Sequence, residues 1–203
     1  MYVARILYPV EVLGPGKRIG IWFAGCEHRC RGCSNPELWP QDEQYNTSLS
    51  AVMKLVNLIS SQYPVDGFTL TGGDPVFQPD DLKRLLGELK RINPDILLYT
   101  GYTIDEVRKI APSIFDEIAV LIDGEYIEAR NNGSLLRGSD NQNIYVINAD
   151  FQVIYDDYFQ KLARNEIQNF STGDGIISVG IHHPDYIDRL REKSGEKGLE
   201  KVK

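Results

Sequence analysis

The hydrophobic residues of this chain fall into two patterns that alternate along its length. Short runs rich in apolar and β-branched residues predict buried strands. Each run ends in a turn or a polar segment, and several of these contain glycine. The predicted strands are residues 19–24, 68–71, 96–99, 118–122, 144–147 and 176–179.

Between the predicted strands, apolar residues recur with the spacing of an amphipathic helix. The first such stripe covers residues 49–59, with Thr47 or Ser48 as its N-cap. The second carries leucines at helical spacing over residues 82–89. The sequence Thr-Ile-Asp-Glu at 103–106 is a capping box that opens a third helix.

Strands that alternate with helices predict an α/β fold, in which right-handed crossovers connect the strands of a parallel sheet. Ligands bind such sheets at the carboxyl ends of the strands. Three conspicuous motifs follow predicted strands: a loop with all the cysteines, Gly72-Gly73-Asp74 and Thr100-Gly101-Tyr102. We therefore expect these motifs to meet at one edge of the sheet.

The length and composition are those of one ordinary soluble domain. The chain has 203 residues, of which 42% are hydrophobic and 25% charged. No apolar run approaches the roughly 20 residues of a membrane span. The residues after Met1 lack the long apolar core of a signal peptide, so a cytoplasmic protein is expected. The charged stretch 191–203 is predicted to be a flexible tail.

The charge argues against nucleic acid as the main partner. The chain carries 22 basic and 29 acidic residues and has a net charge of −7, which disfavours broad contact with phosphate backbones. Arg29, Arg31 and the pair Lys17-Arg18 lie near the cysteines in the sequence. These four basic residues are consistent with a local basic patch.

The three cysteines point to a metal centre. Cys26, Cys30 and Cys33 form a C-x3-C-x2-C pattern. An odd and tightly clustered set is a poor disulfide framework, and the polar neighbours Glu27 and His28 do not suggest a buried apolar cluster. Three thiolates on so short a loop can bind three irons of a [4Fe–4S] cluster and leave the fourth iron open. An open coordination position is what a catalytic centre needs.

Other interpretations of the cysteine loop remain open. With His28 as a fourth ligand, the loop could form a Cys3His zinc site, although a ligand inside the same short loop would be cramped. A non-catalytic module that holds zinc or a cluster is a second alternative. A simple electron-transfer protein is a third, and the absence of a fourth cysteine argues against it.

The cysteine pattern resembles the defining motif of the radical S-adenosylmethionine superfamily, with Gly32 where many members carry an aromatic residue. The segment around Gly72-Gly73-Asp74 resembles the superfamily's "GGE" motif in an Asp variant. The resemblance implies that S-adenosylmethionine occupies the open iron and that one electron cleaves it to a 5′-deoxyadenosyl radical. It also implies cofactor contacts, which would come from Gly32, Cys33, Ser34, Gly72, Gly73, Asp74 and Thr100. The stretch from Val179 to His183 resembles a late strand that reaches the adenine.

The order of several blocks is similar to that in one family, the anaerobic ribonucleoside-triphosphate reductase activating proteins. This implies a partial (β/α)6 barrel, open on one side, and an enzyme that generates a glycyl radical on the large reductase subunit, with a flavodoxin or ferredoxin as electron donor. The alternative is an enzyme of the same branch that acts on a different protein, peptide or small molecule. The similarity covers about residues 5–147 of a single domain at 1–190, which leaves a C-terminal extension at 148–190. The blocks are Gly14-Pro15-Gly16-Lys17-Arg18, the cysteine loop with Asn35-Pro36-Glu37-Leu38-Trp39, Gly72-Gly73-Asp74-Pro75, Tyr99-Thr100-Gly101-Tyr102 and Arg137-Gly138-Ser139-Asp140-Asn141-Gln142.

Overall fold

The structure is a computed structural model that describes residues 1–203 except 174, 184, 187, 191 and 193–203. Apart from residue 192, the tail predicted to be flexible at 191–203 lies outside the described residues. Within the described part of the chain, no helix combines the length and the apolar character that crossing a membrane requires.

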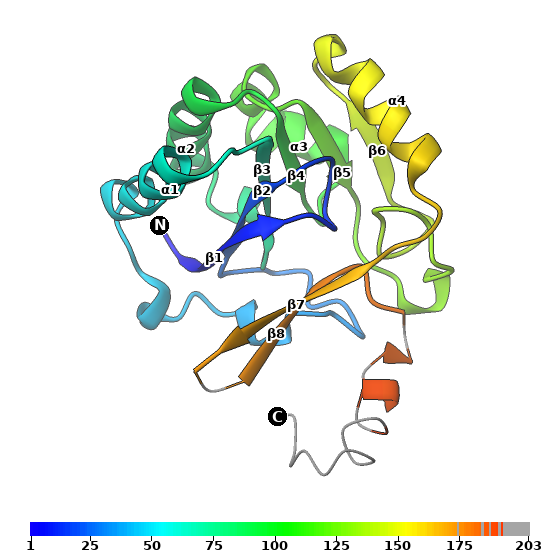
Figure 1. The fold of residues 1–203 in the computed structure, drawn as a ribbon. Helices are drawn as coiled ribbons and strands as arrows, with labels where there is room; N and C mark the ends of the chain where they lie inside the picture. The colour runs from blue at the N-terminus through cyan, green and yellow to red at the C-terminus, as the bar shows by residue number, and fades with distance from the viewer. Residues whose placement is uncertain (174, 184, 187, 191, 193–203) are drawn as a thin grey trace.

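A six-stranded sheet forms the centre of the fold, with its strands in the order of the sequence (Figure 1). The four central strands are parallel, and each edge strand is antiparallel to its neighbour. The α/β class with a mostly parallel sheet is thus confirmed. The strands are β1 (Val3–Val10), β2 (Arg18–Phe23), β3 (Gly67–Gly72), β4 (Ile96–Tyr99), β5 (Val120–Asp123) and β6 (Asn143–Val146).

The predicted parallel sheet is present at the centre, but the two edge strands are antiparallel to their neighbours. Strand β6, predicted at 144–147, returns antiparallel to β5 because a long loop connects the two instead of a crossover helix. Strand β1 was not predicted, and it pairs with β2 through a register that shifts twice. The sheet order places β1 and β6 at the two ends of the sheet.

Three helices connect the parallel strands, and all three were predicted. They are α1 (Leu49–Gln62), α2 (Pro79–Ile92) and α3 (Ile104–Ile110). Ser48 is the N-cap of α1, since its hydroxyl accepts a hydrogen bond from the Ala51 amide at 3.1 Å. The predicted capping box at Thr103 is also present.

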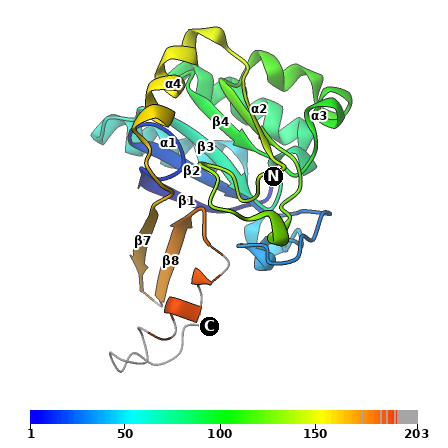
Figure 2. The same ribbon diagram turned by 90° about the vertical axis from the view of Figure 1, so that its right-hand side faces the viewer.

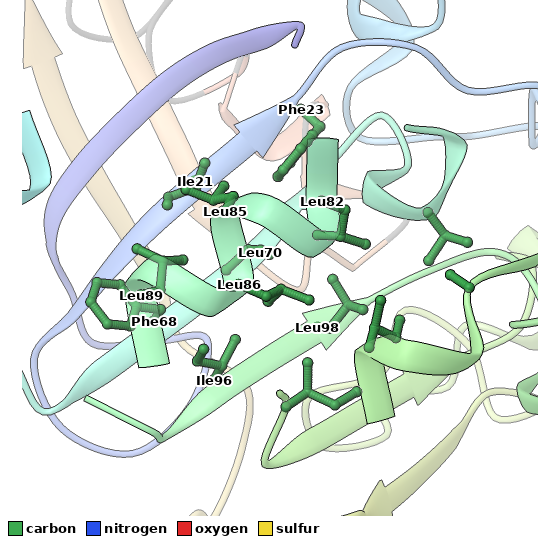
Figure 3. Packing of buried hydrophobic residues seen from close by; sticks show 14 of the residues in the cluster. Ile21, Phe23, Phe68, Leu70, Leu82, Leu85, Leu86, Leu89, Ile96 and Leu98 are labelled. Carbon is green, nitrogen blue, oxygen red and sulfur yellow. The ribbon is translucent and has the colours of Figure 1, made fainter. Parts of the chain in front are cut away.

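The main core lies between these helices and the sheet. Each of the four leucines of α2 is fully buried against apolar residues of β2, β3 and β4, as Figure 3 shows. Because they recur at helical spacing, one face of α2 supplies all of them. The residues in contact there include Leu82, Leu85, Leu86, Leu89, Ile21, Phe68, Leu70, Ile96 and Leu98.

Short 3-10 turns complete the connections. They lie at Pro36–Leu38, Glu43–Tyr45, Pro75–Phe77, Pro112–Asp116, Glu128–Arg130 and Ala149–Phe151.

Among its described residues, the C-terminal extension contributes helix α4 and a hairpin to the fold. Helix α4 (Gln152–Lys161) was not predicted, because Val153 and Ile154 are exposed and blur its apolar stripe. Strands β7 (Ile167–Thr172) and β8 (Gly175–Gly180) form a separate antiparallel pair that projects on the side of β1 (Figure 2). The strand predicted at 176–179 is therefore present as β8, but it is not part of the main sheet.

A buried ion pair lies at the amino ends of the parallel strands. Arg18 begins β2 and is fully buried, with Nη1 2.9 Å from Asp95 Oδ2 and Nη2 3.1 Å from Asp95 Oδ1. Its Nε donates to Thr69 Oγ1 at 2.8 Å, and the Tyr155 hydroxyl of α4 donates to Asp95 Oδ1 at 2.7 Å. Since the cysteines follow the opposite end of β2, Arg18 contributes nothing to a basic patch beside them.

Candidate functional site

The cysteine loop begins where β2 ends, and its base is closed by backbone hydrogen bonds. The Gly25 amide donates to the Leu38 carbonyl at 2.8 Å, and the Cys26 amide donates to the Trp39 carbonyl at 2.9 Å. Gly25 has a φ of 104°, a left-handed value that favours glycine. The two ends of the loop, at residues 25–26 and 38–39, are thus held side by side at the carboxyl edge of the sheet.

All three thiols are free and partly buried, and backbone amides lie near each of them. Two amides of its own loop interact with Cys26. The Asn35 amide donates to Cys33 Sγ at 3.4 Å. The Tyr126 amide, from outside the loop, lies close enough to Cys30 to favour its thiolate form, as does the amide of Cys30 itself. Hydrogen bonds of this kind orient thiolate ligands and tune the potential of iron–sulfur clusters.

Burial favours the protonated form of two of the thiols. It raises the pKa of Cys26 to about 11, and it also raises the pKa of Cys30. Among the described residues, no group of three or more Cys, His, Asp or Glu side chains is arranged to hold a metal ion. Three soft ligands on one loop, each beside amide donors, nevertheless have the donor chemistry that a [4Fe–4S] cluster needs.

Gly72 and Gly73 bring the end of β3 against the cysteine loop. Gly72 has a φ of 112°, and a Cβ there would lie 2.5 Å from the backbone N and O of Phe23. A Cβ on Gly73 would lie 2.5 Å from the Gly25 carbonyl oxygen. The Asp74 amide then donates to that same Gly25 oxygen at 2.8 Å. The two glycines are needed because backbone packs on backbone at this point.

Asp74 joins the end of β3 to the end of β4. Its carboxylate is almost fully buried and accepts from the Val76 amide at 2.9 Å and the Gly101 amide at 2.8 Å. The Thr100 hydroxyl donates to the same carboxylate, at 2.9 Å from Oδ1 and 3.0 Å from Oδ2. The predicted neighbours Asp74 and Thr100 therefore contact each other directly, close to the cysteine loop.

His28 lies between two carboxylates from different strands. Its Nε2 is 3.3 Å from Asp74 Oδ2, an ion-pair distance without a well-aligned hydrogen bond, and its Nδ1 is 3.0 Å from Glu125 Oε1. The contact with Asp74 outweighs the effect of burial and, with help from Glu125, raises the pKa of His28 to about 9. Both ring nitrogens thus face carboxylates, and neither points to the thiols as a zinc ligand would.

The loop between β5 and β6 packs on the cysteine loop. Besides Glu125 and Tyr126, it presents Glu128, whose Oε2 lies 3.2 Å from Arg31 Nε. Glu128 also contacts the position of Gly32, where a Cβ would lie 2.6 Å from its Oε1. The cysteine loop is therefore held from the β5 side at several points.

The polar block at 137–142 shapes this same loop. Gln142 is buried, and its Oε1 accepts from the Gly138 amide at 2.8 Å and the Ser139 amide at 3.2 Å. Its Nε2 donates to the Gly124 carbonyl at 2.7 Å. The block thus holds the two ends of the β5–β6 loop together, a role that its polar composition alone did not specify.

An acidic cavity of about 630 Å³ opens beside the cysteine loop, at the carboxyl ends of β4 and β5. It has the size of a small-molecule site. The three cysteines, Gly32, Ser34, Gly72, Gly73, Asp74 and Thr100 do not line it, although His28 and Gly101 connect it to Asp74. Its walls are Glu27, His28, Gly101, Tyr102, Thr103, Glu106, Asp123, Gly124, Glu125, Asn141 and Asn143.

The structure thus brings most of the predicted residues to one edge of the sheet. Gly32 faces the β5–β6 loop, and Ser34 is exposed. Sequence reasoning missed the contacts of His28, Glu125 and Tyr126. The only signal for the last two was their place directly after a predicted strand.

Comparison with known proteins defines the class. Residues 12–145 match the family described as a 4Fe-4S single cluster domain. With three free thiols on one loop at the carboxyl edge of a mostly parallel sheet, the chain is an iron–sulfur enzyme of the radical S-adenosylmethionine class, and its cofactors are a [4Fe–4S] cluster and S-adenosylmethionine.

Similarity to individual proteins defines the family. Relatives named anaerobic ribonucleoside-triphosphate reductase-activating protein occur in Enterobacteria phage T4 (33% identical over 144 residues, 68% of this chain and 90% of the relative) and in Escherichia coli K12 (32% over 146 residues, 68% and 94%). The relative in Pasteurella multocida is 36% identical over 153 residues, 68% of this chain and 93% of its own. The chain belongs to this family of glycyl-radical-activating enzymes.

Proposed function

We propose that this protein cleaves S-adenosylmethionine reductively and uses the resulting 5′-deoxyadenosyl radical to generate a glycyl radical on an anaerobic ribonucleoside-triphosphate reductase. The observation that carries the proposal is the cysteine loop, where three free thiols with amide donors lie beside Asp74 and an acidic cavity. The names of the relatives support the choice of protein substrate.

In this proposal Cys26, Cys30 and Cys33 would hold the [4Fe–4S] cluster and leave one iron without a protein ligand, where S-adenosylmethionine would bind. When bound, the cluster supplies the single electron that breaks the S–C5′ bond and releases methionine and the 5′-deoxyadenosyl radical. The residues of the chain orient and shield these groups. The amides near each thiol stabilise the ligating thiolates, with the Tyr126 amide serving Cys30.

The cofactor would lie along the cavity, with its methionine end toward Asp74. The acidic lining, which includes Glu27 and Glu125, favours a ligand that carries a sulfonium and an ammonium group. Gly72, Gly73 and Thr100 hold Asp74 in place, and Gly32, Cys33 and Ser34 would contact the cofactor from the cysteine loop. The abstracted hydrogen comes from the target glycine, and the products are 5′-deoxyadenosine and the glycyl radical.

The arrangement of the sheet suits a protein substrate. We interpret β1–β6 as a reduced form of the partial (β/α)6 barrel of radical enzymes, open at one side, within a domain that spans residues 1–190. A glycine loop of the reductase would reach the cavity through the open side. A flavodoxin or ferredoxin would supply the electron in the cytoplasm.

Anaerobic reconstitution with iron and sulfide tests the proposal. Reduced protein is incubated with S-adenosylmethionine, and 5′-deoxyadenosine is measured against a Cys30→Ala variant. We expect product in the wild type and none in the variant. Addition of the reductase should give a glycyl-radical EPR signal.

Two other results would favour a different function. Cleavage without a glycyl radical on the reductase would favour an enzyme of the same branch with another substrate. A reduced cluster, or a zinc ion, with no cleavage would favour the non-catalytic module.

A further inference from the structure

We propose that His28 is a positioning residue, which holds the cysteine loop against the ends of β3 and β5 and thereby fixes the cluster relative to the cavity. The consequence for S-adenosylmethionine binding rests on the proposed function. The structural part, the ordering of the loop, can be tested without cofactor.

The burial of His28 contrasts with its surroundings. Its side chain is 9% exposed, whereas the residues on either side, Glu27 and Arg29, are exposed. A polar side chain that turns inward from an exposed loop needs partners that compensate for its lost hydration. The loop is thus bent toward the sheet at the position midway between Cys26 and Cys30.

The partners of His28 come from two strands that are not adjacent. Asp74 follows β3, and Glu125 follows β5. Asp74 is itself fixed by the Gly101 amide at the end of β4. Through one imidazole, the cysteine loop is therefore connected to the ends of three parallel strands.

The shape of the surroundings matches the ring. A Cβ on Gly101 would lie 2.5 Å from His28 Cδ2 and 2.7 Å from its Nε2, so the space of a side chain at 101 is taken by the imidazole. On another side, the Tyr102 ring packs edge-on, with the ring centroids 4.5 Å apart. The Tyr102 hydroxyl donates to Glu27 Oε1, which adds a second connection between the loop and this end of the sheet.

His28 lies two residues from Cys26 and two from Cys30, so a shift of its ring displaces two ligands together. The same ring forms part of the cavity wall. The position of the His28 ring therefore sets the distance between the cysteine ligands and a molecule bound in the cavity. This distance matters because enzyme reactions are sensitive to displacements on the order of 1 Å.

Hydrogen exchange of the cofactor-free protein tests the structural part. Amides of residues 26–33 are compared in the wild type, in His28→Ala and in a matched control, His183→Ala. Like His28, His183 pairs with a carboxylate, since its Nδ1 lies 2.6 Å from Asp185 Oδ1. Unlike His28, His183 does not line the cavity. We expect faster exchange of these amides in His28→Ala only, and by a larger factor than the fall in its global stability, measured from the urea midpoint, accounts for.

The reconstituted protein tests the functional part. We expect His28→Ala to bind wild-type amounts of iron and sulfide, because all three cysteines remain. The dissociation constant for S-adenosylmethionine should rise about tenfold, the lower end of the 10–100-fold losses in metal affinity or activity that follow when a residue supporting a metal ligand is replaced. The change that S-adenosylmethionine causes in the EPR spectrum of the reduced cluster should be weakened or altered.

Gly101→Ala provides a second variant that keeps the histidine and displaces its ring. It should reproduce the altered EPR response and the weaker binding. Wild-type exchange, affinity and EPR response in both variants would overturn the proposal. Loss of iron in His28→Ala as complete as in Cys30→Ala would also overturn it, because His28 would then be a ligand. Failure of the proposed function is distinguishable, since wild-type protein would then cleave no S-adenosylmethionine while the exchange result could still hold.

Discussion

Arg18 and Asp95 form a bidentate ion pair inside the protein, between the first residue of β2 and the residue before β4. The Tyr155 hydroxyl of α4 donates to the same carboxylate. The pair lies at the opposite end of β2 from the cysteines. It therefore connects the sheet and helix α4 without taking part in the site.

We expect Arg18→Met to lower the free energy of unfolding by about 3–5 kcal/mol, because it leaves Asp95 buried without a counter-charge. Urea denaturation monitored by circular dichroism measures the change. The exposed neighbour serves as control, and Lys17→Met should differ from wild type by less than about 0.5 kcal/mol. Equal stability of the two variants would contradict the buried pair.

Gly73→Ala should destabilise the protein by about 1–3 kcal/mol and reduce the iron retained after reconstitution, since its methyl group would collide with the Gly25 carbonyl and push the cysteine loop away. Gly87→Ala is the matched control. Nothing lies within 4 Å of a Cβ at this position in α2, so that change should stabilise the protein by up to about 1 kcal/mol. Normal iron content in Gly73→Ala would show that the loop tolerates the shift.

Gln142→Ala should loosen the β5–β6 loop, because it removes three buried hydrogen bonds worth about 2–3 kcal/mol together. The Tyr126 amide would then be held less firmly against Cys30, and the cluster should be lost several-fold faster to a chelator. Absorbance of the cluster follows the loss. Gln152→Ala, at an exposed position of α4, should keep the wild-type rate. Equal rates of cluster loss in the two variants would show that the β5–β6 loop does not stabilise the cluster.

Val179→Ala tests the contact between the C-terminal hairpin and the main domain. Val179 of β8 is 3% exposed in a cluster with Trp22 and Leu38, and its truncation should cost about 1.5 kcal/mol. Hydrogen exchange in β7 and β8 should accelerate. Ile176→Ala, on the same strand but 65% exposed, should leave both quantities unchanged. Equal effects of the two variants would mean that the hairpin does not pack as described.

The elements that sequence predicted were those with a strong local signal. The leucines of α2 and the capping box of α3 are patterns within a few residues, and both were confirmed. The direction of β6 depends instead on how a long, polar loop returns to β5, which no local pattern specifies. Helix α4 was missed because its exposed apolar residues hide the side that packs on the sheet.

The residues of the candidate site also differ in whether a local sequence pattern could reveal them. Cys26, Cys30 and Cys33 stand out by spacing alone, and Asp74 by its place at a strand end. By contrast, Glu125 is an ordinary exposed glutamate until the fold brings it to His28, 97 residues away in the sequence. The Tyr126 contact was beyond sequence reasoning for another reason: its donor is a backbone amide, which every residue type except proline offers.

The closed base of the cysteine loop bears on how the cluster is acquired. The backbone hydrogen bonds of Gly25 and Cys26 to residues 38 and 39 fix both ends of the loop in the protein chain itself. Much of the conformational entropy that an open segment would lose on enclosing a cluster is therefore already lost when the protein folds. Cluster assembly then has only the interior of the loop left to order, so that folding prepares the chain to capture iron and sulfide.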